Sequence, residues 1–184
     1  QDAPEPADIS GLPGPRVLYV GALEYWFDTE LVADAARRHP EASFVLIGPA
    51  MGADLAPLEA SENVHLLGPR PYDALPGYMR HCDVGIVPFV RDELVDAIHP
   101  IKVYEYLAAG LPVAAISWTE LEGMAAPIES AERVGFGDAL ARALAAGSTG
   151  RDERIAYARA NSWDARYQVV SQAIETHLGG GNRA

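Results

Sequence analysis

The chain has 184 residues, of which 49% are hydrophobic, and this is enough for one domain with a substantial core. Its formal net charge of -12 argues against binding to nucleic acid or to an anionic membrane surface, because both need faces rich in lysine and arginine. The single cysteine, Cys82, excludes an internal disulfide and a multi-cysteine metal site, and no apolar run approaches the roughly 20 residues that span a bilayer.

Residues 1–15 are predicted to be a linker between domains. They hold four prolines and two glycines and show little apolar periodicity. The N-terminus also lacks the basic and apolar regions of a signal peptide. We therefore expect a soluble, cytoplasmic segment, with any association at the inner face of a membrane made by chain outside this sequence.

From Arg16 onward, apolar runs of strand length alternate with segments of helical periodicity. The predicted strands are 16–21, 43–48, 63–68, 83–89 and 111–117, and the predicted helices between them are 29–39, 54–60, 73–81 and 100–110. Continuous apolar strands that are each followed by a helix indicate a parallel sheet covered on both faces. We predict a doubly wound, Rossmann-like α/β domain of about six strands.

The C-terminal third is predicted to be helical over 137–147, 151–162 and 163–178. Ser162 is a suitable N-cap for the last of these helices. The glycine-rich residues 179–184 are expected to be a disordered tail. One domain is thus predicted from residue 16 to residue 178.

Ligands of such sheets bind in the loops that follow the carboxyl ends of the strands. The loop after the first strand has one glycine, Gly21, where a dinucleotide fingerprint needs three. The sequence also lacks a phosphate-loop motif, an H-E-x-x-H zinc motif, a D-x-D pair and a G-x-S-x-G serine motif. We therefore expect neither a metal site nor a cofactor, and no dehydrogenase, phosphate-loop NTPase or serine hydrolase chemistry.

Lys102 is the only lysine of the chain, and it lies in the first turn of the predicted helix 100–110. Pro100 suits the first position of that helix and Gly110 the position after its end. The positive end of the helix dipole repels a lysine there unless an anion lies between them. Glu105 lies on the same face one turn further, where a carboxylate could bind two vicinal hydroxyls. The pattern is typical of a nucleotide lying along a helix start.

These residues also have purely structural interpretations. Lys102 and Glu105 could form an exposed ion pair three residues apart. Capping, surface or packing roles remain open for other charged and aromatic residues, namely His99, Arg70, Tyr72, Trp26 and Trp118.

The stretch HPIKVYEYLAAGLPVAAIS closely resembles the donor-site segment of GT-B glycosyltransferases, in which P-x-K-x-x-E-Y-L-A-x-G-x-P-V-V is a familiar pattern. The segments YVGALEYWFDTELVADAARRHPEASFVLIGP, NVHLLGPRPYDALPGYMRHCDVGIVPF and NSWDARYQVV resemble the opening, middle and closing helix of the C-terminal domain of these enzymes. The resemblance covers about residues 16–178. The chain is similar to group 1, family-4-like enzymes and to bacterial exopolysaccharide glycosyltransferases.

The resemblance implies one GT-B half that binds a nucleotide-sugar donor, a UDP- or GDP-sugar. An N-terminal acceptor domain of the same polypeptide would be missing from this chain. Glu105 would bind the ribose hydroxyls and Lys102 the diphosphate, and both would serve catalysis. The other donor-binding positions that the resemblance implies are His99 and Ile101 for the diphosphate, Gly21 and Ala22 for close backbone approach, and Arg70 and Tyr72 beside the base.

One departure from the family pattern concerns Ala97. Family-4 enzymes carry Glu-x7-Glu, and Ala97 occupies the position of the first glutamate. Asp96 could take over its role near the donor sugar. Retention or inversion of the anomeric centre is left open, and an inverting enzyme would take its general base from the missing half.

Three alternatives to transfer are considered. A nucleotide-sugar 2-epimerase would keep the site but need no acceptor, and it would form an epimer from a UDP-sugar alone. A non-catalytic nucleotide-sugar-binding module would agree with Ala97. A flavodoxin-like signalling domain is disfavoured, because Lys102 begins a helix after the fourth strand instead of following the last one.

Overall fold

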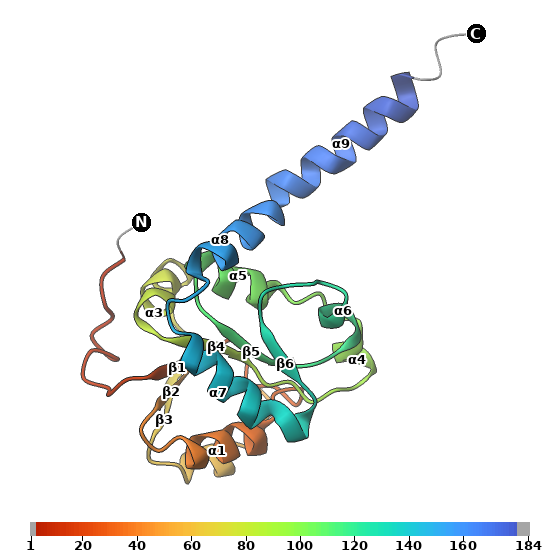
Figure 1. Ribbon diagram of the computed structural model, residues 1–184. Coiled ribbons are helices and arrows are strands. Elements are labelled where there is room, and N and C mark those ends of the chain that lie inside the picture. Colours follow the sequence, from red (N-terminus) through yellow and green to blue (C-terminus); the bar gives the residue numbers. More distant parts are fainter. Residues whose placement is uncertain (1–2, 180–184) are drawn as a thin grey trace.

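The computed structural model describes residues 3–179, which form a parallel sheet covered by helices on both faces (Figure 1). The strands are β1 (Arg16–Val20), β2 (Ser43–Ile47), β3 (Val64–Gly68), β4 (Val84–Val87), β5 (Val113–Ile116) and β6 (Glu129–Ala131). Their order in the sheet is β3-β2-β1-β4-β5-β6, and all pairs are parallel. This order confirms the predicted doubly wound α/β fold.

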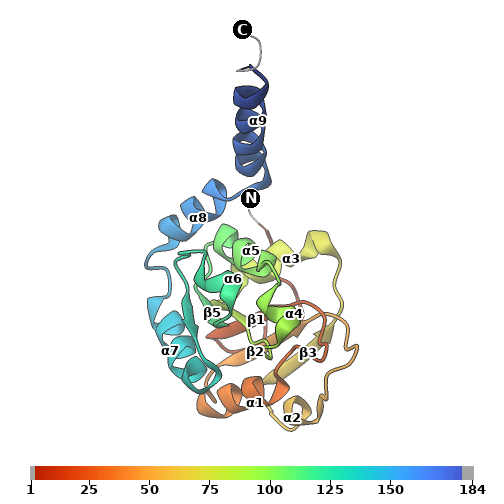
Figure 2. The same ribbon diagram turned by 90° about the vertical axis from the view of Figure 1, so that its right-hand side faces the viewer.

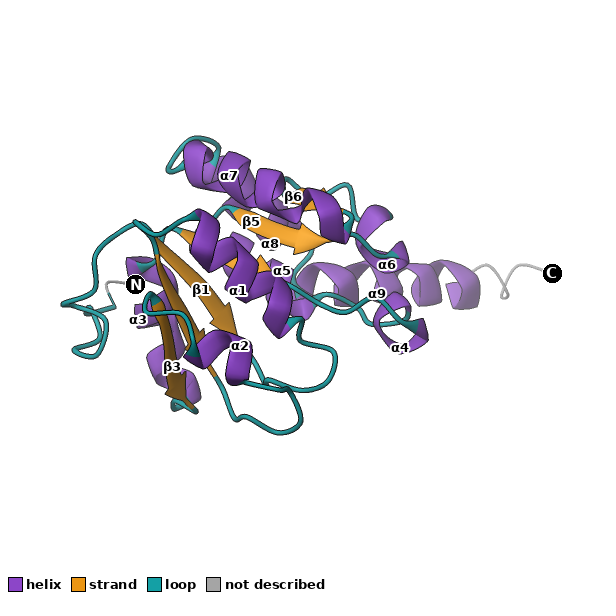
Figure 3. Ribbon diagram, turned by 90° about the horizontal axis from the view of Figure 1, so that it is seen from below, coloured by secondary structure: helices purple, strands orange, loops and turns teal. Residues whose placement is uncertain are grey.

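The helices form one layer on each face of the sheet (Figures 1 and 3). The layer on one face contains α1 (Thr29–Arg38), α2 (Ala56–Glu59) and α7 (Phe136–Ala146), and the other contains α3 (Leu75–His81), α5 (Ile101–Ala109) and α8 (Arg151–Ala160). Two short helices, α4 (Glu93–Asp96) and α6 (Thr119–Glu122), lie beyond the carboxyl ends of the strands (Figure 2). The start of α5 lies at this same edge.

Side chains of the central strands fill the core on both faces of the sheet. Every residue of β2, β4 and β5 is buried, and so are the three inner residues of β1. This explains why these strands read as continuous apolar runs. Strand β6 was not located from the sequence, because its residues, Glu-Ser-Ala, lack such a run. Cys82 is buried just before β4.

Helix α8 packs on α5 through a buried arginine. Arg154 is only 5% exposed, and its guanidinium donates to the carbonyl oxygens of Gly110, Gly147 and Thr149. These carbonyls include the C-cap of α5, so Arg154 fixes the end of that helix. Gly110, as predicted, ends α5 in the left-handed conformation, with φ of 81°.

The last helix, α9 (Trp163–Gly179), extends away from the sheet (Figures 1 and 2). Ser162 Oγ accepts a hydrogen bond from Ala165 N at 3.2 Å, which confirms the predicted N-cap. Of the predicted tail, Gly179 ends α9, and residues 180–184 lie outside the described residues. No helix within residues 3–179 is long and apolar enough to cross a membrane.

Residues 3–12 pack against the domain beside α3 (Figure 1). The side chain of Ile9 is completely buried in the core. Arg16, where β1 begins as predicted, donates to the carbonyl oxygen of Leu12 and to the carboxylate of Glu5. A linker role for residues 1–15 stays a prediction, but residues 3–12 follow one fixed path along this domain.

Candidate functional site

Helix α5 is held close to the sheet by Tyr106. The Tyr106 ring lies so near Gly85 of β4 that a Cβ atom there would be 2.5 Å from it. Its hydroxyl accepts a hydrogen bond of 2.9 Å from the amide of Val20, the last residue of β1. Ala108 and Ala109 line a cavity beside α3. Gly85 is the small residue that lets the helix approach.

Lys102 extends from the first turn of α5 toward the end of β1. A Cβ atom on Gly21 would lie 2.5 Å from Lys102 Cε and 2.9 Å from Nζ, so only glycine leaves room for this side chain. The ammonium lies 5.8 Å from the ring centroid of Tyr19 and 5.6 Å from that of Phe89. The structure therefore brings together Lys102 and Gly21, as the sequence predicted.

The charge of Lys102 has no acidic partner within ion-pair distance among residues 3–179. Burial lowers the pKa of Lys102, and the charge of Glu105 acts in the opposite direction. The alternative of a Lys102–Glu105 ion pair is thus wrong for this structure. The site holds a half-buried cation that needs an anion.

Two backbone amides near Lys102 also lack a protein acceptor in the described chain. The amides of Ile101 and Val103 donate to the carbonyl oxygens of His99 and Pro100, whereas the amide of Lys102 donates to none. The amide of Ala22 is likewise without an acceptor. The predicted anion site at the helix start therefore has fewer free donors than expected. Pro100 is the N-cap and not the first helical residue.

Glu105 lies one turn beyond Lys102 and borders two cavities. The larger one, of about 520 Å³, lies between α3, α5 and α8. The smaller one, of about 310 Å³, lies between α5 and the turn from α8 to α9. Burial raises the pKa of Glu105, and the charge of Lys102 opposes the shift. Glu105 accepts no hydrogen bond from a described protein group, so its oxygens can bind hydroxyls of a ligand.

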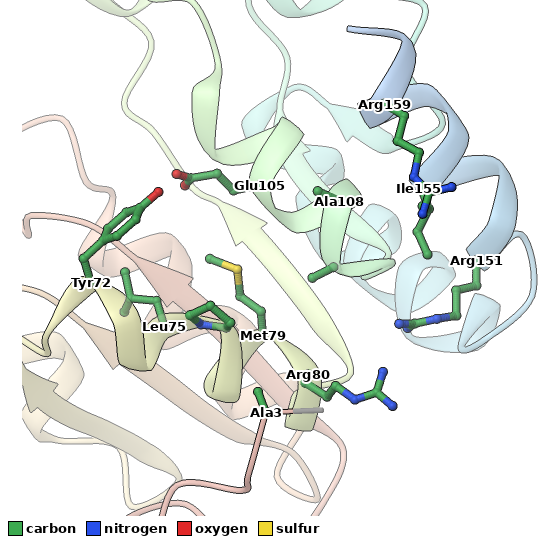
Figure 4. A pocket seen from close by; sticks show the side chains of 12 residues that line it. Ala3, Tyr72, Leu75, Met79, Arg80, Glu105, Ala108, Arg151, Ile155 and Arg159 are labelled. Carbon is green, nitrogen blue, oxygen red and sulfur yellow. The ribbon is translucent and has the colours of Figure 1, made fainter. Parts of the chain in front are cut away.

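Three other predicted residues line these cavities. Tyr72 is 79% exposed, borders both cavities and points toward Glu105 (Figure 4). His99 and Ile101 line the smaller cavity. The ring of His99 stacks on Tyr104 at 5.5 Å and does not cap α5, whose N-cap is Pro100.

Two predicted residues, Arg70 and Asp96, line neither cavity. Arg70 donates hydrogen bonds to Asp8, to Tyr78 and to the carbonyl oxygens of Leu67 and Pro69. Asp96 pairs with Arg91 at 3.0 Å and accepts a 3.3 Å hydrogen bond from the amide of Thr119. Both side chains hold neighbouring loops in place. Ala97, as the C-cap of α4, contributes no carboxylate.

Neither the rings that surround Lys102 nor the residues that hold Arg70 could be identified from the sequence. Tyr19 and Phe89 lie in and after apolar strands, where an aromatic residue normally signals packing alone. Trp118 is completely buried, and its indole N–H donates to the carbonyl oxygen of Ile98, so its role is packing. No group of three or more metal-binding side chains occurs in the described part of the chain.

Comparisons with known proteins identify several chains that are similar to this one. A curated relative, the putative teichuronic acid biosynthesis glycosyltransferase TuaH of Bacillus subtilis, is 26% identical over 96% of this chain and 48% of its own length. The fold matches a UDP-forming trehalose-phosphate synthase from Burkholderia xenovorans with a TM-score of 0.66 and 17% identity, over 96% of this chain and 46% of that one. It also matches Anabaena HepE, solved with UDP and glucose, with a TM-score of 0.65 and 18% identity, over 90% and 48% of the two chains.

The chain spans about half the length of these proteins, as expected for one GT-B half. The family model for glycosyl transferases group 1 matches residues 14–147. These residues include β1, the 69–74 turn and α5, which together form the site described above. This chain belongs to the glycosyl transferases group 1 family.

Proposed function

We propose that this chain is the donor-binding half of an enzyme that transfers a sugar from a nucleoside-diphosphate sugar to a glycan or lipid-linked acceptor. The observation that carries the proposal is the unpaired, half-buried ammonium of Lys102 at the carboxyl edge of the sheet. A diphosphate would supply the missing negative charge. The acceptor would be bound by the missing N-terminal half, which would also make any contact with a cytoplasmic membrane face.

The diphosphate, the ribose and the base of the donor would each have a suitable partner in this site. The diphosphate would lie between the Lys102 ammonium and the free amides of Ala22 and Lys102, where the helix dipole also favours an anion. Glu105 would accept hydrogen bonds from the ribose hydroxyls. The base would enter the 520 Å³ cavity beside Tyr72, which is within the usual size range of ligand pockets.

Catalysis by this half would be electrostatic. Negative charge develops on the leaving nucleoside diphosphate as the bond to the sugar breaks, and Lys102 would stabilise that charge without a metal ion. HepE was solved with UDP, and a trehalose-6-phosphate enzyme of Escherichia coli with UDP-2-fluoro-glucose, which supports a uridine nucleotide as the first candidate. GDP is the second candidate.

Isothermal titration of the 184-residue chain with UDP, GDP, ADP and dTDP tests this proposal. We expect one or two of the four to bind with 1:1 stoichiometry. Binding should weaken with salt, because it depends on charge. A chain that is folded but binds none of the four would contradict the donor site.

A further inference from the structure

Residues 3–12, called here the N-terminal segment, are fastened to the turn that carries Tyr72. The buried side chain of Ile9 anchors the segment in the core. The carbonyl oxygen of Ala3 lies 3.0 Å from His81 Nε2 at the end of α3. In Figure 1 the segment runs beside α3. It is therefore part of the wall of this domain, although it precedes the first strand.

Helix α3 leaves room for the segment at Gly77. A Cβ atom there would lie 2.9 Å from the carbonyl oxygen of Pro4 and 3.3 Å from Pro6 Cγ. A larger residue would push the segment away from the helix. Ala3, in the N-terminal segment, lines the 520 Å³ cavity together with Tyr72 and Glu105 (Figure 4).

Asp8 is the centre of the attachment. Its Oδ2 atom accepts from Arg70 Nη2 at 2.8 Å and Arg70 Nε at 3.0 Å. The Tyr78 hydroxyl lies 2.9 Å from Oδ1 and 2.8 Å from Oδ2 of the same carboxylate. Arg70 Nε also lies 3.1 Å from that hydroxyl. The three side chains thus form a closed hydrogen-bonded group that links the segment, the 69–74 turn and α3.

The other donors of Arg70 fix the backbone on which Tyr72 stands. Arg70 Nη1 donates to the carbonyl oxygens of Leu67, in β3, and Pro69. Tyr72 follows two residues later and begins a 3₁₀ turn over Tyr72–Ala74. Tyr78 lies on α3, from which Leu75 and Met79 line the cavity. Asp8 therefore orients Arg70 and Tyr78, which hold the 69–74 turn and α3 on the two sides of the predicted base pocket.

We propose that Asp8, Arg70 and Tyr78 are positioning residues for the nucleotide, and that the N-terminal segment sets the shape of the base pocket through them. This inference rests on the proposed donor-binding function. It gives Arg70 a different role from the direct base contact that the sequence suggested. The group acts through the position of Tyr72 and touches no part of the nucleotide.

Hydrogen bonding and charge explain why Asp8 is suited to this role. Burial opposes ionisation of Asp8, but hydrogen bonds from Arg70 and Tyr78, with the charge of Arg70, outweigh it and hold the pKa of Asp8 below its ordinary value. The carboxylate is therefore ionised at neutral pH. Replacing it with an amide would leave the Arg70 guanidinium without its counter-charge.

The test compares Asp8→Asn and Tyr78→Phe with Glu5→Gln in the 184-residue chain. Glu5 lies on the same segment as Asp8, but its side chain pairs with Arg16 of β1 and makes no hydrogen bond or ion pair with the 69–74 turn, so its variant is the matched control. The two readouts are amide hydrogen exchange of residues 69–76 and the Kd for UDP and GDP. Exchange reports local opening without any ligand, and the Kd reports the pocket.

For Asp8→Asn we expect faster exchange in residues 69–76 and a Kd that rises about tenfold, with a smaller rise for Tyr78→Phe. The Glu5→Gln chain should match the wild type in both readouts. An unchanged Kd in Asp8→Asn would overturn the inference, whether or not exchange is faster. Failure of the proposed function is seen separately, because in that case the wild-type chain itself binds neither nucleotide.

Discussion

The start of α5 and the 69–74 turn both carry charged side chains at the carboxyl edge of the sheet, but they treat these charges in opposite ways. In the turn, the Arg70 guanidinium has a carboxylate, a hydroxyl and two carbonyl oxygens as partners. At the start of α5, Lys102 and Glu105 have no ion pair or side-chain hydrogen bond with any described residue.

This difference separates a structural charge from a functional one. A charged group that is buried without a partner costs stability, so such a group in a folded domain is a candidate for a functional role. The Arg70 group is satisfied by partners within the protein, whereas we propose that a ligand supplies the partners of Lys102 and Glu105. The lack of a protein partner is thus what distinguishes Lys102 and Glu105 from Arg70.

The largest expected effect comes from removing the unpaired charges. In a full-length enzyme that contains this chain, Lys102→Ala and Glu105→Ala should each lower the rate of sugar transfer, by about 10²- to 10³-fold for Lys102. The reason is the loss of charge stabilisation or ribose binding. Steady-state kinetics with the preferred nucleotide sugar measures this. Wild-type rates in both variants would end the proposal for this site.

Loss of the Arg70 hydrogen bonds should lower the stability of the folded chain. Arg70→Ala removes the guanidinium that donates hydrogen bonds to Asp8, to Tyr78 and to two carbonyl oxygens. We expect the free energy of unfolding to fall by about 1–3 kcal/mol. Arg37→Ala is the control, since Arg37 makes only an exposed 3.4 Å contact with Asp34. Urea unfolding of the two variants decides the point. Equal effects would mean that the Arg70 group contributes no more than a surface pair.

A methyl group on Gly21 should displace Lys102 and also strain the backbone, because the φ of Gly21 is 153°. Gly21→Ala would place a Cβ atom 2.5 Å from Lys102 Cε, and the flexible lysine would have to move. We expect nucleotide affinity to fall about tenfold, equal to about 1.4 kcal/mol. Gly147→Ala is the control for backbone strain, because Gly147 also has a positive φ, 50°, and a Cβ atom there would meet nothing within 4 Å. Calorimetry that finds the same Kd in both variants would contradict the placement of Lys102.

The smallest expected effect is a pH dependence of stability from Glu105. Burial raises its pKa in the folded state above the ordinary value of 4.5, so the folded state binds the proton more tightly than the unfolded state. This contribution to stability is lost as pH rises from 4.5 through the raised value. The stability of Glu105→Gln relative to wild type should therefore be higher at pH 7 than at pH 4. Urea unfolding with no such change would show that Glu105 is well solvated.

Much of the fold could be predicted from the sequence, because apolar runs of β1, β2, β4 and β5 reflect burial on both faces. The Lys102–Glu105 spacing on α5 was also visible, since helical periodicity places them on one face. The attachment of Arg70 to Asp8 was not, because 62 residues separate them and no local pattern encodes the contact. The packing of Tyr106 on Gly85 was missed for the same reason.

The central claim is that the Lys102 ammonium binds the diphosphate of the donor. Its most direct test is urea unfolding of the wild-type chain and of Lys102→Met, each with and without UDP or GDP, whichever of the two binds more tightly. Methionine keeps the apolar stem of lysine and removes only the charge. We predict that Lys102→Met without nucleotide is at least as stable as wild type, because the pKa of Lys102 is lowered by burial. Nucleotide at 100 times its Kd should stabilise the wild type by about 2.7 kcal/mol and leave Lys102→Met nearly unchanged. Equal stabilisation of both chains, or a variant that is less stable without nucleotide, would contradict the account.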